Sequence, residues 1–169
     1  MKLNYSMLFA NNGIRKYIEK QTSIAPLVVF RVVFGVILLF TVIRTFLLGW
    51  VDKFYCAPNF FFTFYGFEWL QPMGSIGIYS LYLVIILAVL GIILGAFYRV
   101  SSILFFTIFT YFELLDVTNY LNHYYLISLL AFLICFLPAN RAYSIDVWRN
   151  PKLKVDTSNY EKNRTLYEE

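Results

Sequence analysis

The run SIGIYSLYLVIILAVLGIILGAF, residues 75–97, decides the fold class of this chain. It has no charged residue and is longer than the roughly 20 apolar residues that an α-helix needs to cross a bilayer. The whole chain has the same character, with 60% apolar and 21% aromatic residues, against a usual apolar fraction of about one half. The sequence therefore predicts an integral membrane protein and excludes a soluble enzyme.

Further apolar runs on both sides predict an all-α, polytopic bundle of about four transmembrane helices. We place the bundle at residues 24–149, with spans at about 24–48, 75–97, 100–118 and 121–138. The last two apolar runs are short, so these spans must include polar residues at their ends. An amphipathic leader, residues 1–23, precedes the bundle, and a polar tail, residues 150–169, follows it.

The positions of Lys and Arg predict the orientation, because cytoplasmic loops close to the spans hold an excess of them. These residues gather before the first span, between the second and third, and after the fourth: Lys2, Arg15, Lys16, Lys20, Arg99, Arg141, Arg149, Lys152 and Lys154. We therefore expect both termini to be cytoplasmic, more in keeping with a bacterial inner membrane than with the endoplasmic reticulum. These clusters account for the net charge of +4, so the partner that we expect is the lipid bilayer and no nucleic acid.

The loop at residues 49–74 is too aromatic for a simple linker. Aromatic rings at this density favour the headgroup layer of a membrane, where the ring is half buried and a hydroxyl or indole N–H stays wet. We interpret the loop as an aromatic outer lid above the end of the bundle that holds Asp116 and His123. Trp50 and Trp69 of this loop, with Asp116 and Tyr120, are our candidates for binding a cofactor.

Charged residues within the predicted spans each cost about 2.5–3.5 kcal/mol at mid-bilayer and need a partner or a purpose. Arg31 is deep in the first span but near enough to its cytoplasmic end to snorkel toward water. Arg44 and Glu113 lie near the outer ends of the first and third spans, so they could pair at one level. A structural ion pair and a role at a polar active cavity both stay open.

The stretch DVTNYLNHYYL, residues 116–126, places polar groups between two apolar runs. If the third helix continued this far, Glu113, Asp116, Tyr120 and His123 would share one face. Asn119 and Asn122 favour a break instead, because asparagine is a good N-cap for the fourth span.

His123 is the only histidine, and a proton or hydrogen-bond relay suits it, since its reference pKa of about 6.5 leaves both forms accessible. A lone histidine with scattered carboxylates lacks the ligand spacing of a zinc or di-iron site, so we expect no metal. Cys56 and Cys135 fall on opposite sides of the membrane and cannot form a disulfide with each other. The absence of a C-x-x-C motif excludes a quinone-linked thiol oxidoreductase.

Several motifs occur in order along residues 30–148. They are Phe30-Arg31-Val32-Val33-Phe34-Gly35, Tyr98-Arg99-Val100-Ser101, the segment 116–126 with Asn122-His123, the segment 129–132, and Ala139-Asn140 followed by Ser144 and Asp146. Together they resemble the membrane domain of the vitamin K-dependent gamma-carboxylase family and its bacterial relatives.

This resemblance implies a lyase-type carboxylation in which reduced vitamin K, or a related quinol, drives removal of a gamma proton from peptidyl glutamate. The cofactor supplies the difficult chemistry, and the protein orients it and excludes water. His123 and Asn122 match positions of the family near the reacting groups, which makes them the candidate catalytic residues. Cys56 falls near a cysteine of the family. The usual partner of that cysteine would lie downstream of this chain.

The resemblance covers the N-terminal portion of the family only. In the family, the lysine credited with deprotonating the quinol lies on a later membrane segment. We therefore expect this chain to be incomplete or inactive alone and to need a C-terminal half or a partner membrane protein. A non-catalytic membrane scaffold or a lipid- or quinone-binding module stays open. A transporter component is disfavoured, because inverted repeats and broken helices are missing.

Overall fold

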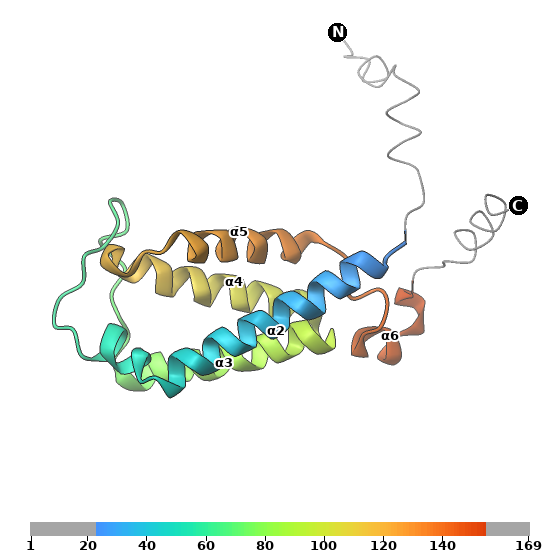
Figure 1. The fold of residues 1–169 in the computed structure, drawn as a ribbon, viewed down its shortest axis with the longest axis horizontal. Coiled ribbons are helices and arrows are strands. Elements are labelled where there is room, and N and C mark those ends of the chain that lie inside the picture. The colour runs from blue at the N-terminus through green and yellow to red at the C-terminus, as the bar shows by residue number, and fades with distance from the viewer. Residues whose placement is uncertain (1–22, 155–169) are drawn as a thin grey trace, which may run out of the picture. The chain divides into compact units, whose positions relative to one another are not determined.

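The computed structural model describes residues 23–154, and every regular element in this range is helical, which confirms the all-α prediction. The elements in chain order are α2 (Ala25–Leu47), the π-helical turn η2 (Asp52–Cys56), α3 (Ser75–Leu94), α4 (Tyr98–Leu115), the 3-10 turn η3 (Val117–Asn119), α5 (Asn122–Phe136), α6 (Ile145–Arg149) and the 3-10 turn η4 (Pro151–Leu153) (Figure 1). Almost all of the predicted leader and most of the predicted tail lie outside the described residues.

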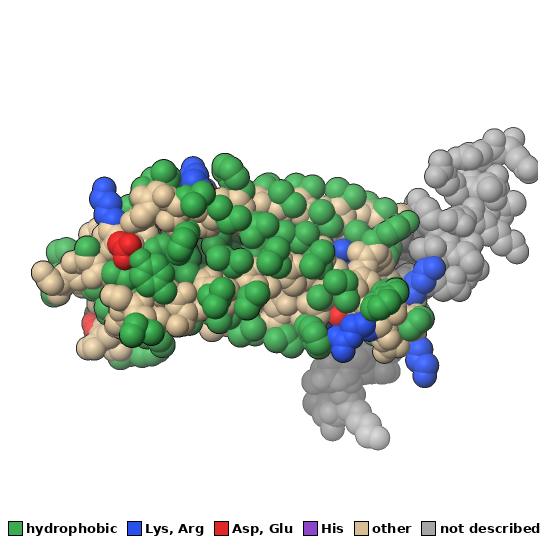
Figure 2. All heavy atoms as spheres, turned by 90° about the horizontal axis from the view of Figure 1, so that it is seen from below, with side chains coloured by type: hydrophobic (Ala, Val, Ile, Leu, Met, Phe, Trp, Pro, Cys, Tyr) green, Lys and Arg blue, Asp and Glu red, His purple; other side chains and the backbone are tan. Residues whose placement is uncertain are grey.

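Three of these helices are long and apolar enough to cross a membrane: α2 with 23 residues, α3 with 20 and α4 with 18. Helix α5 is apolar but has only 15 residues, or about 22 Å at 1.5 Å per residue, short of a hydrocarbon core of about 30 Å. Hydrophobic side chains cover the middle of the bundle, whereas charged side chains gather toward its two ends (Figure 2). The chain is thus a multi-pass membrane protein, and α5, at the position of the predicted fourth span, is shorter than the expected 121–138.

The helices pack as neighbours in sequence: α3 lies against α2 and α4, and α5 lies against α4. Leu38, Val89, Phe105 and Ile134 from these four helices are each at most 2% exposed and form the core. We call the end that carries residues 48–74 and 116–121 the loop end. The opposite end, with residues 95–97 and 137–154, is the turn end.

At the turn end, Gly95 ends α3 with a left-handed backbone, φ +62°, and this starts the tight turn into α4. A Cβ atom at this position would collide with the side chains of Ser144 and Arg31. Glycine therefore satisfies two demands here, the backbone conformation and the close approach of the segment that follows α5.

Arg31 is the largest fully buried side chain, with 1% of its surface exposed. Its guanidinium donates from Nη1 to the Ala139 carbonyl at 2.8 Å and from Nη2 to the Tyr143 carbonyl at 2.6 Å. The expectation that Arg31 snorkels toward water is therefore wrong. The segment after α5 folds over the guanidinium and supplies carbonyl acceptors in place of water, so Arg31 ties α2 to the α5–α6 connection.

Asp146 holds the start of α4. Its carboxylate accepts from the backbone amides of Phe97 (2.8 Å) and Tyr98 (3.1 Å) and from Nδ2 of Asn140 (2.9 Å), while its own amide donates to the Gly95 carbonyl (3.0 Å). Burial alone would raise the pKa of Asp146, but these hydrogen bonds outweigh it and lower the pKa below its ordinary value. Arg31, Gly95, Tyr98, Asn140 and Asp146 form what we call the turn-end cluster.

Arg31→Met should lower the free energy of unfolding by about 3 kcal/mol, because the buried Ala139 carbonyl and the partly buried Tyr143 carbonyl lose a charged donor. Arg31→Lys should recover part of this loss, since one ammonium keeps the charge but cannot reproduce the forked geometry. Unfolding of the detergent-solubilised protein measures both. Arg141→Met, an exposed arginine at the same end, is the matched control and should change stability by less than about 0.5 kcal/mol. Equal losses in Arg31→Met and Arg141→Met would contradict the structural role.

Asp146→Asn should destabilise the protein at neutral pH, with a deficit that shrinks as the pH falls below about 4. The sign follows from a folded-state pKa lower than the unfolded value of about 3.9. The carboxylate then contributes stability above the unfolded pKa, and this contribution is lost as the pH falls through the folded pKa. Unfolding midpoints of both proteins across this range give the measurement. A deficit that does not change with pH would show that the ionised carboxylate is not what stabilises the turn end.

Candidate functional site

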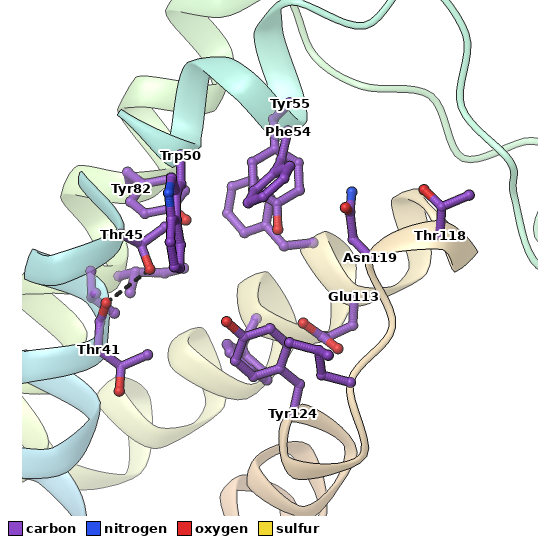
Figure 3. Close-up of a pocket in the computed structure, with 15 residues that line it drawn as sticks. Thr41, Thr45, Trp50, Phe54, Tyr55, Tyr82, Glu113, Thr118, Asn119 and Tyr124 are labelled. Atoms are coloured by element: carbon purple, nitrogen blue, oxygen red, sulfur yellow. Dashed lines mark hydrogen bonds between the residues drawn. The ribbon is translucent and has the colours of Figure 1, made fainter. Parts of the chain in front are cut away.

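A cavity of about 320 Å³ lies at the loop end of the bundle (Figure 3). Helices α2 and α3 with η2 form one side of it, and α4, η3 and the start of α5 form the other. Its lining consists of Thr41, Val42, Thr45, Trp50, Phe54, Tyr55, Tyr82, Ile85, Phe109, Phe112, Glu113, Thr118, Asn119, Leu121 and Tyr124.

The walls of the cavity are mainly aromatic. The Phe112 ring lies between those of Tyr55 and Tyr82, with centroids 4.8 Å and 5.1 Å away. Trp50 and Tyr82 lie on one side, and Glu113 and Tyr124 lie next to each other on the other side (Figure 3). The arrangement provides flat apolar surfaces with a few polar groups between them.

The threonine hydroxyls in the wall are already used. Thr41 donates to the Ile37 carbonyl and Thr45 to the Thr41 carbonyl, both at 2.9 Å. By contrast, no hydrogen bond within residues 23–154 joins the Glu113 carboxyl to another lining side chain (Figure 3). Glu113 is therefore the group in this cavity best placed to bond to a ligand.

The proposed pair of Arg44 and Glu113 is not formed: in the part of the chain that the structure describes, no ion pair joins them. Arg44 is exposed, and its guanidinium lies over the Trp50 ring, 5.2 Å from the centroid. This cation–π contact occupies Arg44, whereas Glu113 lines the cavity. The role at a polar cavity, the other interpretation that the sequence left open, stays a proposal.

His123 and Asn122, the candidate catalytic residues, are exposed on the first turn of α5 and are not among the lining residues. They lie in sequence between Leu121 and Tyr124, which do line the cavity, and the His123 ring is 4.4 Å from that of Tyr124. Asn122 is the first residue of α5, and no side chain caps this helix. The expectation that Asn119 or Asn122 caps this helix is therefore wrong.

The four candidate cofactor-binding residues separate in space. Trp50 lines the cavity. Asp116 is buried and instead caps η3, accepting from the Thr118 amide at 2.9 Å and hydroxyl at 2.8 Å. Tyr120 is 43% exposed and lies outside the lining, and Trp69 lines a different hollow. Because α4 ends at Leu115, the three polar residues that follow Glu113 at helical spacing do not continue its face.

Tyr55, Tyr82 and Tyr124 line the cavity, and sequence reasoning missed them as site residues. The sequence feature that could have identified these tyrosines is that several predicted helices carry polar side chains near the same end. Tyr55 belongs to η2, where burial, with smaller effects from Tyr82 and Glu113, raises the pKa of its phenol. Tyr55 therefore stays protonated and is a hydrogen-bond donor.

Cys56 in η2 and Cys135 near the turn end of α5 are both free thiols. Among residues 23–154 there is no group of three or more His, Cys, Asp or Glu side chains that could hold a metal ion. The polar side chains that line the loop-end cavity include the Glu113 carboxyl and the phenols of the three tyrosines.

No solved structure matches the chain. The model of the HTTM domain family matches residues 19–163, which include all the described helices and both ends of the bundle. The motifs that carry the resemblance noted in the sequence lie within this match. The chain therefore belongs to the HTTM domain family, the membrane domain of the vitamin K-dependent gamma-carboxylase family.

Proposed function

We propose that the loop-end cavity binds the ring of a membrane quinol and that the chain is the quinol-binding part of a carboxylase-like system. The observation that carries this proposal is a carboxyl, Glu113, that lines an aromatic cavity without an ion-pair partner among the described residues. An ionisable residue inside a membrane span is costly, which makes it a functional-site hypothesis by default.

The size and chemistry of the cavity fit such a group. A volume of about 320 Å³ falls within the range of about 300–1,000 Å³ that is usual for small-molecule sites. Trp50, Tyr82 and Phe109 offer flat faces for a planar ring. Glu113 supplies an acceptor for the hydroxyls of a quinol, and the phenols of Tyr55 and Tyr124 supply donors to its ring oxygens or to the carbonyls of the corresponding quinone.

A bound quinol would supply the redox chemistry that the family implies. The residues of the chain would orient the ring and keep water out. Glu113 would accept a hydrogen bond from a ring hydroxyl and hold its proton, and Tyr124 would donate to a ring oxygen. His123, exposed and in contact with Tyr124, is positioned to exchange protons with water, and Asn122 beside it would help to hold this segment.

We also propose that the loop end faces the exterior and that both termini are cytoplasmic, as the alternation of Lys and Arg supports. A bacterial inner membrane suits this orientation. No lysine among the described residues lines the cavity, so the base that the family uses would come from a C-terminal half or a partner membrane protein, and the peptidyl glutamate would meet the quinol there. The chain alone would bind a quinol without turning it over.

Glu113→Gln should weaken binding of a reduced naphthoquinone to the protein in nanodiscs by at least about tenfold. The estimate follows from the loss of a hydrogen bond to a charged group, about 1.5–3 kcal/mol. Titration calorimetry gives the dissociation constants. Glu68→Gln, the same change at an exposed residue of the loop, should leave the affinity unchanged. Equal affinities of the unchanged protein, Glu113→Gln and Glu68→Gln would show that the quinol does not bind at Glu113.

Co-expression with the downstream half of a full-length relative should restore quinol epoxidation, while the chain alone should show none. His123→Ala and Asn122→Ala should reduce the restored rate without lowering the amount of folded protein, and Glu113→Gln should reduce it further. Epoxidation by the chain alone would refute the need for an external base. Restored activity that both α5 substitutions leave unchanged would remove His123 and Asn122 from the proposal. A scaffold role predicts no epoxidation in any combination.

A further inference from the structure

A second hollow, of about 610 Å³, lies against α4 and shares no residue with the cavity described above. We call it the side groove. It is lined by Phe67, Trp69, Leu70, Gln71, Met73, Phe106, Thr107, Thr110, Tyr111 and Leu114.

The side groove lies on the face of α4 that points away from the core of the bundle. Phe105, Ile108 and Phe112 are buried and mark the core face of this helix. Thr107, Thr110 and Leu114 follow one another at spacings of three and four, so they form a separate stripe. The floor of the groove is therefore a face of α4 that is distinct from its core face.

The wall of the groove is the second half of the aromatic loop, residues 67–73. The Tyr111 hydroxyl fixes this segment, because it accepts from the Met73 amide at 3.2 Å and donates to the Gln71 carbonyl at 3.0 Å. The expectation of a lid over the end of the bundle is thus incomplete: this half of the loop lies along the side of α4. These two hydrogen bonds keep the wall in place, so the groove is present before an occupant binds.

The rim of the groove is apolar and open. Trp69 is 73% exposed, Met73 53% and Phe67 38%. Exposed Leu104 and Ile103 continue the apolar surface of the same helix toward the turn end. The groove is therefore continuous with the surface that the bilayer covers, which makes a bilayer component its natural occupant.

Thr110 adds a polar feature to this apolar groove. Its Oγ1 is buried and has no hydrogen-bond partner among residues 23–154. Thr41, Thr45 and Ser80, in contrast, each donate to the carbonyl one helical turn earlier. An unpaired buried hydroxyl costs about 1–3 kcal/mol, so an acceptor from an occupant of the groove would restore that loss.

We propose that the side groove is a binding site for one phospholipid. An acyl chain lies between the wall of residues 67–73 and Phe106 and Leu114 of α4, and an ester carbonyl accepts from Oγ1 of Thr110. Thr110 lies five residues before the end of α4 at Leu115, or about 7 Å along the axis. This depth is close to the polar layer, where Trp69 anchors the rim.

The test is to incorporate the purified protein into phosphatidylcholine nanodiscs doped with a phosphatidylcholine that carries a diazirine in its acyl chain. After illumination, mass spectrometry should find the crosslinks concentrated in peptides that contain residues 67–73 and 106–114. Native mass spectrometry after exchange into detergent should find one phosphatidylcholine retained by the protein.

Leu114→Trp fills the groove and should reduce both the crosslink yield and lipid retention severalfold. Leu104→Trp, the same change at an exposed leucine of α4 outside the groove, is the matched control and should reduce neither. Thr107→Trp provides a second variant that fills the groove should Leu114→Trp fail to fold. Thr110→Val should lower retention about two- to tenfold, as the loss of one hydrogen bond predicts, and Thr107→Val should not.

Crosslinks spread evenly over all exposed helix faces would overturn the proposal, since they would indicate surrounding lipid without a site. Equal retention in Leu114→Trp and Leu104→Trp would do the same. A quinone, or a second copy of the chain, found in the groove in place of phosphatidylcholine would also overturn it. Equal losses in Thr110→Val and Thr107→Val would refute the assigned hydrogen bond.

Discussion

The buried guanidinium of Arg31 is the constraint on which the rest of the bundle depends. A charge at this depth in a membrane span must find acceptors, and it finds them in the carbonyls of Ala139 and Tyr143. The chain after α5 must therefore return to the start of α2. Asp146 on the same segment then holds the first turn of α4. One end of the bundle is fixed in this way, which leaves the other end available for a cavity.

This arrangement places four of the residues that identify the family away from the cavity, although other residues of the family motifs, in the segment 116–126, line it. Arg31, Tyr98, Asn140 and Asp146 belong to the motifs of the resemblance, and all four lie at the turn end, where they bond mainly to backbone groups. These four residues therefore stabilise the fold that the family shares. The proposed function depends on the opposite end, where Glu113 lies among aromatic side chains, so a shared fold does not by itself assign a reaction.

The sequence predicted the helical class and the membrane character because long apolar runs have few other stable structures. It did not predict the partners of Arg31, because backbone carbonyls have no sequence signal and these are 108 and 112 residues away. Arg44 and Glu113 suggested an ion pair by charge alone, but Trp50 competes for the guanidinium. His123 stood out by composition, whereas the tyrosines of the cavity come from three elements that only folding brings together.

Hydrogen–deuterium exchange of the protein in nanodiscs, with and without a reduced naphthoquinone, tests the central claim most directly. If the quinol binds at the loop end, it lies away from the structural contacts at the turn end. We therefore expect new protection in peptides that contain η2 and the η3 to α5 connection, with no change in peptides that contain residues 139–146. Protection confined to residues 139–146, or none in either region, would contradict binding at the loop end.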